Sequence, residues 1–207
     1  MLVTERYIVF NLTHVDLLWR FFMQQRILLR DQLSKAWKAT IHDQYNKHLI
    51  NSERGLQVYF CSALLKIFKE DELTDGMRRI FVEPRLSVGP EDYRYPDIVI
   101  CNTRRIIGVV ELKYLPRGSA DYDKDIDTLN WLVENSEKLK ISNDRFLGIS
   151  QGAKKYSLAE DAVLCWGGVY QCMESSDFNA RISVLGRRFL GLHAVTAKDK
   201  EPIISPP

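Results

Sequence analysis

Two short apolar runs carry the strongest fold signal in the chain: Tyr95 to Cys101 (YPDIVIC) and Arg105 to Lys113 (RIIGVVELK). Both are rich in the β-branched residues that favour strands. The turn sequence Asn102 to Arg104 between them is short enough to join two antiparallel strands. The sequence therefore predicts a β-hairpin here, and the run of apolar residues before Glu111 is typical of a strand that is buried on both faces.

Charged residues interrupt these apolar runs at three positions. Asp97 follows Pro96 near the start of the first run, and Glu111 and Lys113 close the second run. Glu111 and Lys113 are two residues apart, so their side chains project from the same face of a strand. An exposed ion pair contributes only about 0–1 kcal/mol, which is little reason to end such a strand with charges. Carboxylate and carbonyl oxygens suit magnesium, so we expect Asp97, Glu111 and the Leu112 carbonyl to serve as metal ligands.

This expectation depends on the register of the hairpin. Asp97 shares a face with Glu111 only if the loop has an odd number of residues or one strand carries a bulge, because a one-residue slip moves a side chain to the opposite face. A three-residue loop over residues 102–104 satisfies the condition, and so does a bulge at Gly108. If neither is present, the charged residues form an ordinary structural ion-pair network in which Asp97 and Glu111 do not share a face.

Helices are expected before the hairpin. Apolar residues at helical spacing predict one long helix, or two, over about residues 14–47. A further helix begins after an Asn51-Ser52 cap and runs to about Lys69, with a clear apolar stripe. Glu53 in its first turn lies three residues before Leu56 and on the same face, so it either caps the helix or points toward the buried side.

The other elements complete an alternating chain. Period-two alternation over Ile80 to Val88 predicts a strand, with Pro84 marking an edge or a bulge. Pro116 and Gly118 are expected to end the second hairpin strand, and a helix follows over about residues 121–140. Further short strands are expected at Phe146 to Ile149, Ala162 to Trp166, Ile182 to Leu185 and Phe189 to Val195. Such a mixture predicts a sheet flanked by helices.

The residues Pro96-Asp97, then the segment 98–110, then Glu111-Leu112-Lys113, resemble the PD-(D/E)xK motif of the restriction-endonuclease-like nuclease superfamily. The resemblance covers roughly residues 50–170. It implies an α/β fold with an αβββαβ core, a mixed central sheet flanked by helices, and the motif on consecutive strands of a hairpin. A helix before the motif often contributes a further glutamate in this superfamily, and Glu53 matches that position.

The resemblance also implies a function, namely Mg²⁺-dependent (or Mn²⁺-dependent) endonucleolytic hydrolysis of nucleic acid, with DNA as the first expected substrate. Glu53, Asp97, Glu111 and Lys113 are the expected catalytic residues, with Glu53 assisting Asp97, Glu111 and Leu112 at the metal. The alternative is a non-catalytic nucleic-acid-binding or scaffold module on the nuclease fold. Magnesium binding discriminates between the two, because a scaffold does not need the ion.

Three segments are expected: an N-terminal helical extension (1–48), a nuclease-like domain (49–200) and a flexible tail (201–207). The N-terminal helices would serve a homodimer or a protein partner.

The composition is that of an ordinary globular protein, with 45% hydrophobic residues and a net charge of +2, so a nucleic-acid site would have to be a local patch. Four cysteines without a C-x-x-C pair indicate reduced thiols. The chain shows no secretory signal and no run of about 18 apolar residues, so we expect a cytoplasmic protein that is not in a membrane.

Overall fold

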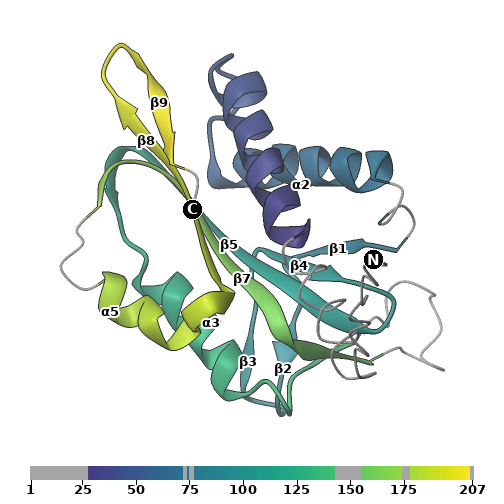
Figure 1. Ribbon diagram of the computed structural model, residues 1–207. Helices are drawn as coiled ribbons and strands as arrows, with labels where there is room; N and C mark the ends of the chain where they lie inside the picture. The colour runs from purple at the N-terminus through teal and green to yellow at the C-terminus, as the bar shows by residue number, and fades with distance from the viewer. Residues whose placement is uncertain (1–27, 72–73, 75–76, 143–154, 174–177, 206–207) are drawn as a thin grey trace, which may run out of the picture.

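The central feature of the fold is a mixed β-sheet with helices on both faces (Figure 1). The computed structural model describes residues 28–71, 74, 77–142, 155–173 and 178–205. The strands are β1 (Arg79–Val82), β2 (Leu86–Ser87), β3 (Tyr93–Arg94), β4 (Ile98–Cys101), β5 (Arg105–Ala120), β6 (Lys140–Ser142), β7 (Lys155–Met173), β8 (Phe189–Ala197) and β9 (Lys200–Ser205). Their order is β1-β4-β5-β7-β6-β2-β3, and β8 and β9 extend the sheet from β7.

Two kinds of pairing build this sheet. β1, β4 and β5 pair antiparallel to one another, as a strand followed by a hairpin should. β5, β7 and β8 pair in parallel. A parallel pair needs a crossover connection, and α3 (Asp123–Glu134) lies in the one between β5 and β7. The predicted order helix, strand, strand, strand, helix, strand is present as α2, β1, β4, β5, α3 and β7, with β2, β3 and β6 inserted.

One face of the sheet is covered by the helix over residues 28–40 and by α2 (Glu53–Glu70). Leu33, Trp37 and Phe60 from these helices share a hydrophobic cluster with Ile98 and Ile100 of β4. The apolar residues of the helix at 28–40 are therefore packed against the sheet, and this described part of the expected N-terminal extension belongs to the same core.

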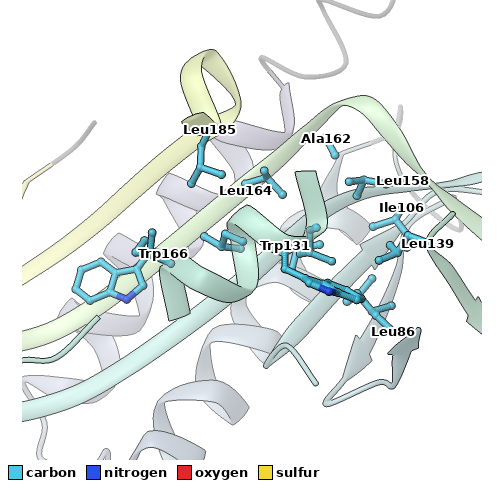
Figure 2. Close-up of a cluster of buried hydrophobic side chains, with 14 of the residues drawn as sticks. Leu86, Ile106, Trp131, Leu139, Leu158, Ala162, Leu164, Trp166 and Leu185 are labelled. Atoms are coloured by element: carbon cyan, nitrogen blue, oxygen red, sulfur yellow. The ribbon is translucent and has the colours of Figure 1, made fainter. Parts of the chain in front are cut away.

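The other face is covered by α3, α5 (Phe178–Ile182) and the 3-10 helix η2 (Ser183–Arg188). Figure 2 shows part of the cluster that these elements bury, including Trp131 of α3 and Leu164 and Trp166 of β7. Side chains that point toward this face of β4 and β5 include Val99 and Val109. Asp97 and Glu111 are two residues away from them and point toward the same face.

The helix α2 starts where the sequence predicts. The Ser52 side chain caps it by accepting a hydrogen bond from the Gly55 N–H (3.1 Å). The predicted apolar stripe is buried at Leu56, Phe60 and Leu64. Because the cap fixes the first turn, the position of Glu53 at the N-terminus of α2 is also fixed.

Several strand predictions were wrong. The run from Ile80 to Val88 is split into β1 and β2, because Glu83 takes a positive φ of 46° and Pro84 has no N–H for a ladder. β5 continues through Pro116, since the irregular pairing between Leu115 and Ser119 leaves that proline out of the ladder with β7. The segment Ile182 to Leu185 is helical and not a strand.

The ends of the chain also differ from expectation. Residues Lys200–Ser205 form β9 on the edge of β8, so most of the segment expected to be a flexible tail is an ordered strand. The expected helix from residue 14 to residue 27 and the expected strand at 146–149 lie outside the described residues. Among the helices described, none combines the length and the apolar character needed to cross a bilayer.

Candidate active site

The register of the β4–β5 hairpin decides which charged side chains meet. Ile98 pairs with Val110 and Ile100 with Gly108, but Cys101 pairs with Ile106, so the register shifts by one residue beside Gly108. Continuing the pairing one step beyond Ile98 sets Asp97 opposite Glu111. The bulge considered for Gly108 is therefore present, and it brings Asp97 to the same face as Glu111 and Lys113.

Beyond the start of β4, the edge of β5 is left without a neighbouring strand. Two carboxylates accept hydrogen bonds from main-chain N–H groups at this edge. Asp97 Oδ2 accepts from Leu112 N (2.6 Å), and Glu53 Oε2 accepts from Tyr114 N (3.2 Å). Leu112 and Tyr114 are two residues apart, so their N–H groups point to the same side of the strand. Asp97 and Glu53 are thus brought together along this open edge of β5, although they are 44 residues apart in a chain of 207.

The main chain of Asp97 is held in place from two sides. Its carbonyl oxygen accepts hydrogen bonds from Gln57 Nε2 (3.0 Å) and from the Glu83 N–H (2.9 Å). Gln57 is buried one turn after Glu53 on α2. The helix therefore contributes both a carboxylate and a fixing contact to this edge.

Glu111 is the most unusual member of the group. Its side chain is only 6% exposed, and its Oε1 atom has no hydrogen-bond partner. Burial, together with the nearby charges of Asp97 and Asp125, raises the pKa of Glu111 well above its usual value. Burial likewise raises the pKa of Asp97 to about 6, with a contribution from Glu53. Such a concentration of carboxylates is unfavourable unless protons or cations balance it.

Lys113 forms an ion pair with a residue of α3, the helix that packs on this face of the sheet. Its Nζ lies 3.9 Å from Asp125 Oδ2 of α3, and the two side chains are 23% and 10% exposed. The same Asp125 oxygen accepts a hydrogen bond from Trp166 Nε1 of β7 (3.2 Å). Asp125 lies in the first turn of α3 and faces the site. The available signal was its place four residues before the apolar Leu129, which predicts the same helix face.

A glycine makes room for the Trp166 ring. A Cβ atom at Gly168 would lie 2.4 Å from the indole, so the ring packs directly against the glycine backbone. Phe178 and His193 enclose the ring with centroid distances of 5.8 and 5.6 Å. The indole is fully buried, and its N–H donates to Asp125.

We expect Gly168→Ala to destabilise the protein by about 1–3 kcal/mol, the usual cost of overpacking a filled core. The added methyl group would displace Trp166, and Asp125 would then lose the contact that orients it toward Lys113. The midpoint of urea unfolding measures the effect. Gly89→Ala is the matched control, because a Cβ there meets no atom within 4 Å. Equal midpoints for the two variants would contradict this packing.

The pKa shifts predict how stability depends on pH when a chelator removes metal ions. The pKa of Asp97 is raised to about 6, and that of Glu111 is raised well above its usual value. The folded state therefore binds protons more tightly than the unfolded state. This contribution is complete below the unfolded pKa values of about 4 and is lost as pH rises through the folded values.

For Asp97 alone, this pH-dependent contribution to the free energy of unfolding is about 2 kcal/mol, allowing for the partial exposure of the side chain. Burial lowers the pKa of His193, which acts with the opposite sign. The comparison is therefore between wild type and Asp97→Asn by urea unfolding from pH 5 to pH 8. Wild type should lose stability relative to the variant as pH rises. Parallel curves of stability against pH for the two proteins would contradict the raised pKa of Asp97.

The carboxylates do not form a complete cation cage. Within the described ranges, no three His, Cys, Asp or Glu side chains converge closely enough to hold a metal by themselves. The chemistry of the site nevertheless fits a divalent cation, since Glu111 Oε1 lacks a partner beside a second carboxylate. A hard cation prefers such oxygen ligands and completes its shell with carbonyl groups and water.

Comparisons with known proteins do not assign this chain to a family. No family model matches the chain, and no curated protein matches it. Among solved structures, the chain is similar to SfsA from Pyrococcus furiosus, determined in complex with Ca²⁺. The sequence identity is 14% and the TM-score is 0.35; the match covers 73% of this chain and 62% of the SfsA chain. The chain thus spans less than two thirds of SfsA, and a likeness of this size does not assign it to a family.

Proposed function

We propose that the chain is a divalent-metal-dependent nuclease that hydrolyses phosphodiester bonds at the open edge of β5. The observation that carries the proposal is Glu111, a buried carboxylate whose Oε1 atom has no partner and which lies opposite Asp97. Glu111 keeps a backbone hydrogen bond with Asp97, but burying a carboxylate while one of its oxygens has no partner is unfavourable. A group retained at such a cost is a candidate for function.

A purely structural ion-pair network accounts for these residues less well. That reading requires Asp97 and Glu111 to lie on different faces, whereas the bulge beside Gly108 brings them to one face. It also requires Lys113 to neutralise Glu111, whereas the ion pair of Lys113 is with Asp125. The arrangement α2, β1, β4, β5, α3, β7 further supports a restriction-endonuclease-like core with the PD-(D/E)xK motif on its hairpin.

In the proposed enzyme, Asp97 and Glu111 would hold a Mg²⁺ or Mn²⁺ ion together with the Leu112 carbonyl, and Glu53 would assist through a water. When bound, the ion would supply a water of lowered pKa and would stabilise charge on the phosphate oxygens. Gln57 and the Leu112 N–H keep the Asp97 carboxylate at this edge. The carboxylates must be ionised for this role, so activity should fall as pH drops through the raised pKa values of Asp97 and Glu111.

Lys113 is the proposed cationic group of the reaction. Its ammonium would hold the attacking water and offset the negative charge that grows on phosphorus. Asp125 keeps that ammonium oriented, and Trp166 in turn fixes Asp125. Asp125 is therefore a positioning residue in this scheme and is not expected to touch the substrate.

The proposal is tested by cleavage of a mixed panel of single-stranded, double-stranded and branched DNA and RNA with Mg²⁺ or Mn²⁺. Wild type is compared with Glu111→Ala, and a chelator serves as the zero-metal control. We expect cleavage by wild type alone, with DNA as the first expected substrate. Binding of nucleic acid without cleavage of any substrate would favour the alternative, a non-catalytic binding module on the same fold.

A further inference from the structure

A groove of about 1150 Å³ opens beside the candidate active site. The groove is lined by residues 45–51, residues 114–117 of β5, Gln171 of β7 and residues 196–202 of the β8–β9 hairpin, which are distant in sequence. This hairpin projects from the sheet (Figure 1). The volume lies near the upper end of the roughly 300–1,000 Å³ of small-molecule pockets and is large enough for an extended chain.

The groove and the active site meet at Tyr114. This residue directly follows Lys113, and its main-chain N–H donates to Glu53. Its side chain lines the groove, and its hydroxyl donates to the Ile50 carbonyl oxygen (2.8 Å), which fixes the ring. Because strand side chains alternate, Tyr114 faces the α2 side of the sheet, whereas Lys113 faces α3. A chain that leaves the active site would therefore reach the groove by crossing the open edge of β5.

The groove offers aromatic rings with a positive charge beside them. Tyr45 and Tyr114 are both half-buried and meet edge to face, with ring centroids 6.3 Å apart at 69°. Arg117 lines the same groove, and its charge acts against the increase in pKa that burial causes in each tyrosine. Aromatic rings and arginine are the groups on which unpaired bases stack.

The charges along the groove are mixed, with an excess of one positive charge. Arg117, Lys198 and Lys200 are basic, and Asp199 and Glu201 are acidic. Across the described residues, none of these five side chains makes a side-chain ion pair. The three cations are therefore available to phosphate groups.

We propose that this groove binds a single-stranded segment of the nucleic-acid substrate as it leaves the active site, with a base against Tyr45 and phosphates at Lys198 and Lys200. The proposal rests on the proposed function and narrows its substrate. Bases in a duplex are already stacked on both faces, so only an unpaired base can use the tyrosine. The preferred substrate is thus a strand that is single-stranded next to the cleaved bond.

The test measures binding in a chelator, so that no cleavage is needed. The full-length protein is titrated into a fluorescent oligothymidine and into a duplex of equal length, with fluorescence anisotropy as the signal. Tyr45→Leu should weaken binding of the single strand about 5- to 150-fold, the equivalent of about 1–3 kcal/mol of stacking. Tyr45→Phe keeps the ring and should bind as wild type does, and duplex binding should change little in either variant.

A second pair of variants keeps the test decisive if Tyr45→Leu does not fold. Lys198→Gln with Lys200→Gln should reduce the slope of log affinity against log salt by about 1.4, or about 0.7 for each phosphate contact. Lys66→Gln with Lys69→Gln on the exposed face of α2 removes the same charge and should leave the slope unchanged. Equal effects of the two lysine pairs, equal losses for single strand and duplex, or no binding of the single strand would overturn the proposal. If the single strand binds as expected but no substrate is cleaved, the result supports the binding groove and contradicts only the proposed nuclease activity.

Discussion

Replacing Glu111 with glutamine should abolish cleavage and, in the absence of metal, make the protein more stable. Glutamine keeps the shape of the side chain but cannot carry the negative charge that a cation requires. We expect the cleavage rate to fall by at least about 100- to 1,000-fold, as when a group that stabilises the transition state is removed. Initial rates with Mg²⁺ measure this loss.

The stability of the same variant should change in the opposite direction. The native site buries a carboxylate that has an unpartnered oxygen and is repelled by Asp97 and Asp125. An uncharged amide removes that repulsion, so the urea midpoint in a chelator should rise above that of wild type, most clearly above pH 7. Glu91→Gln, on an exposed loop, is the matched control and should change neither quantity. A Glu111→Gln enzyme with a wild-type rate would exclude Glu111 from the chemistry.

Lys113→Ala should also abolish cleavage, but through a different step. The variant removes the proposed contact to the attacking water and the phosphate, while Asp97 and Glu111 stay in place. We expect a rate loss of at least about 100-fold, with binding of the metal retained and cooperative unfolding preserved. Cleavage rates together with thermal unfolding followed by circular dichroism separate these effects.

Lys138→Ala is the control, since it removes an exposed lysine just beyond α3. An unchanged cleavage rate in Lys113→Ala would remove Lys113 from the site. A loss of cooperative unfolding in that variant would show instead that the Lys113–Asp125 pair has a structural role.

The hairpin and the helix α2 could be predicted from the sequence because their signals are local. Ser52 caps the helix next to an apolar stripe, and the two β-rich runs are joined by a tight turn. The alternation of strand faces requires either an odd-numbered loop or a bulge, and the bulge lies beside Gly108. The amino-acid pattern thus gives the condition under which Asp97, Glu111 and Lys113 share one face, and the register of the hairpin meets that condition.

Other parts of the site depend on contacts between distant segments. Trp166 reaches Asp125 across 41 residues, and the reason for Gly168 is the ring that lies against it. No periodicity in the sequence encodes such a contact. The length of β5 was missed for a similar reason, since its residues after Lys113 pair with β7, whose register is set by the tertiary fold.

The most direct test of the central claim is calorimetric titration of Mn²⁺ into wild type and into Glu111→Gln in two buffers with different heats of ionisation. Because the pKa of Glu111 is raised well above its usual value, a bound cation must displace a proton. We predict that wild type binds the ion with a heat that depends on the buffer and that Glu111→Gln does not bind. Equal binding by both proteins, or no binding by wild type, would contradict a metal site at the open edge of β5.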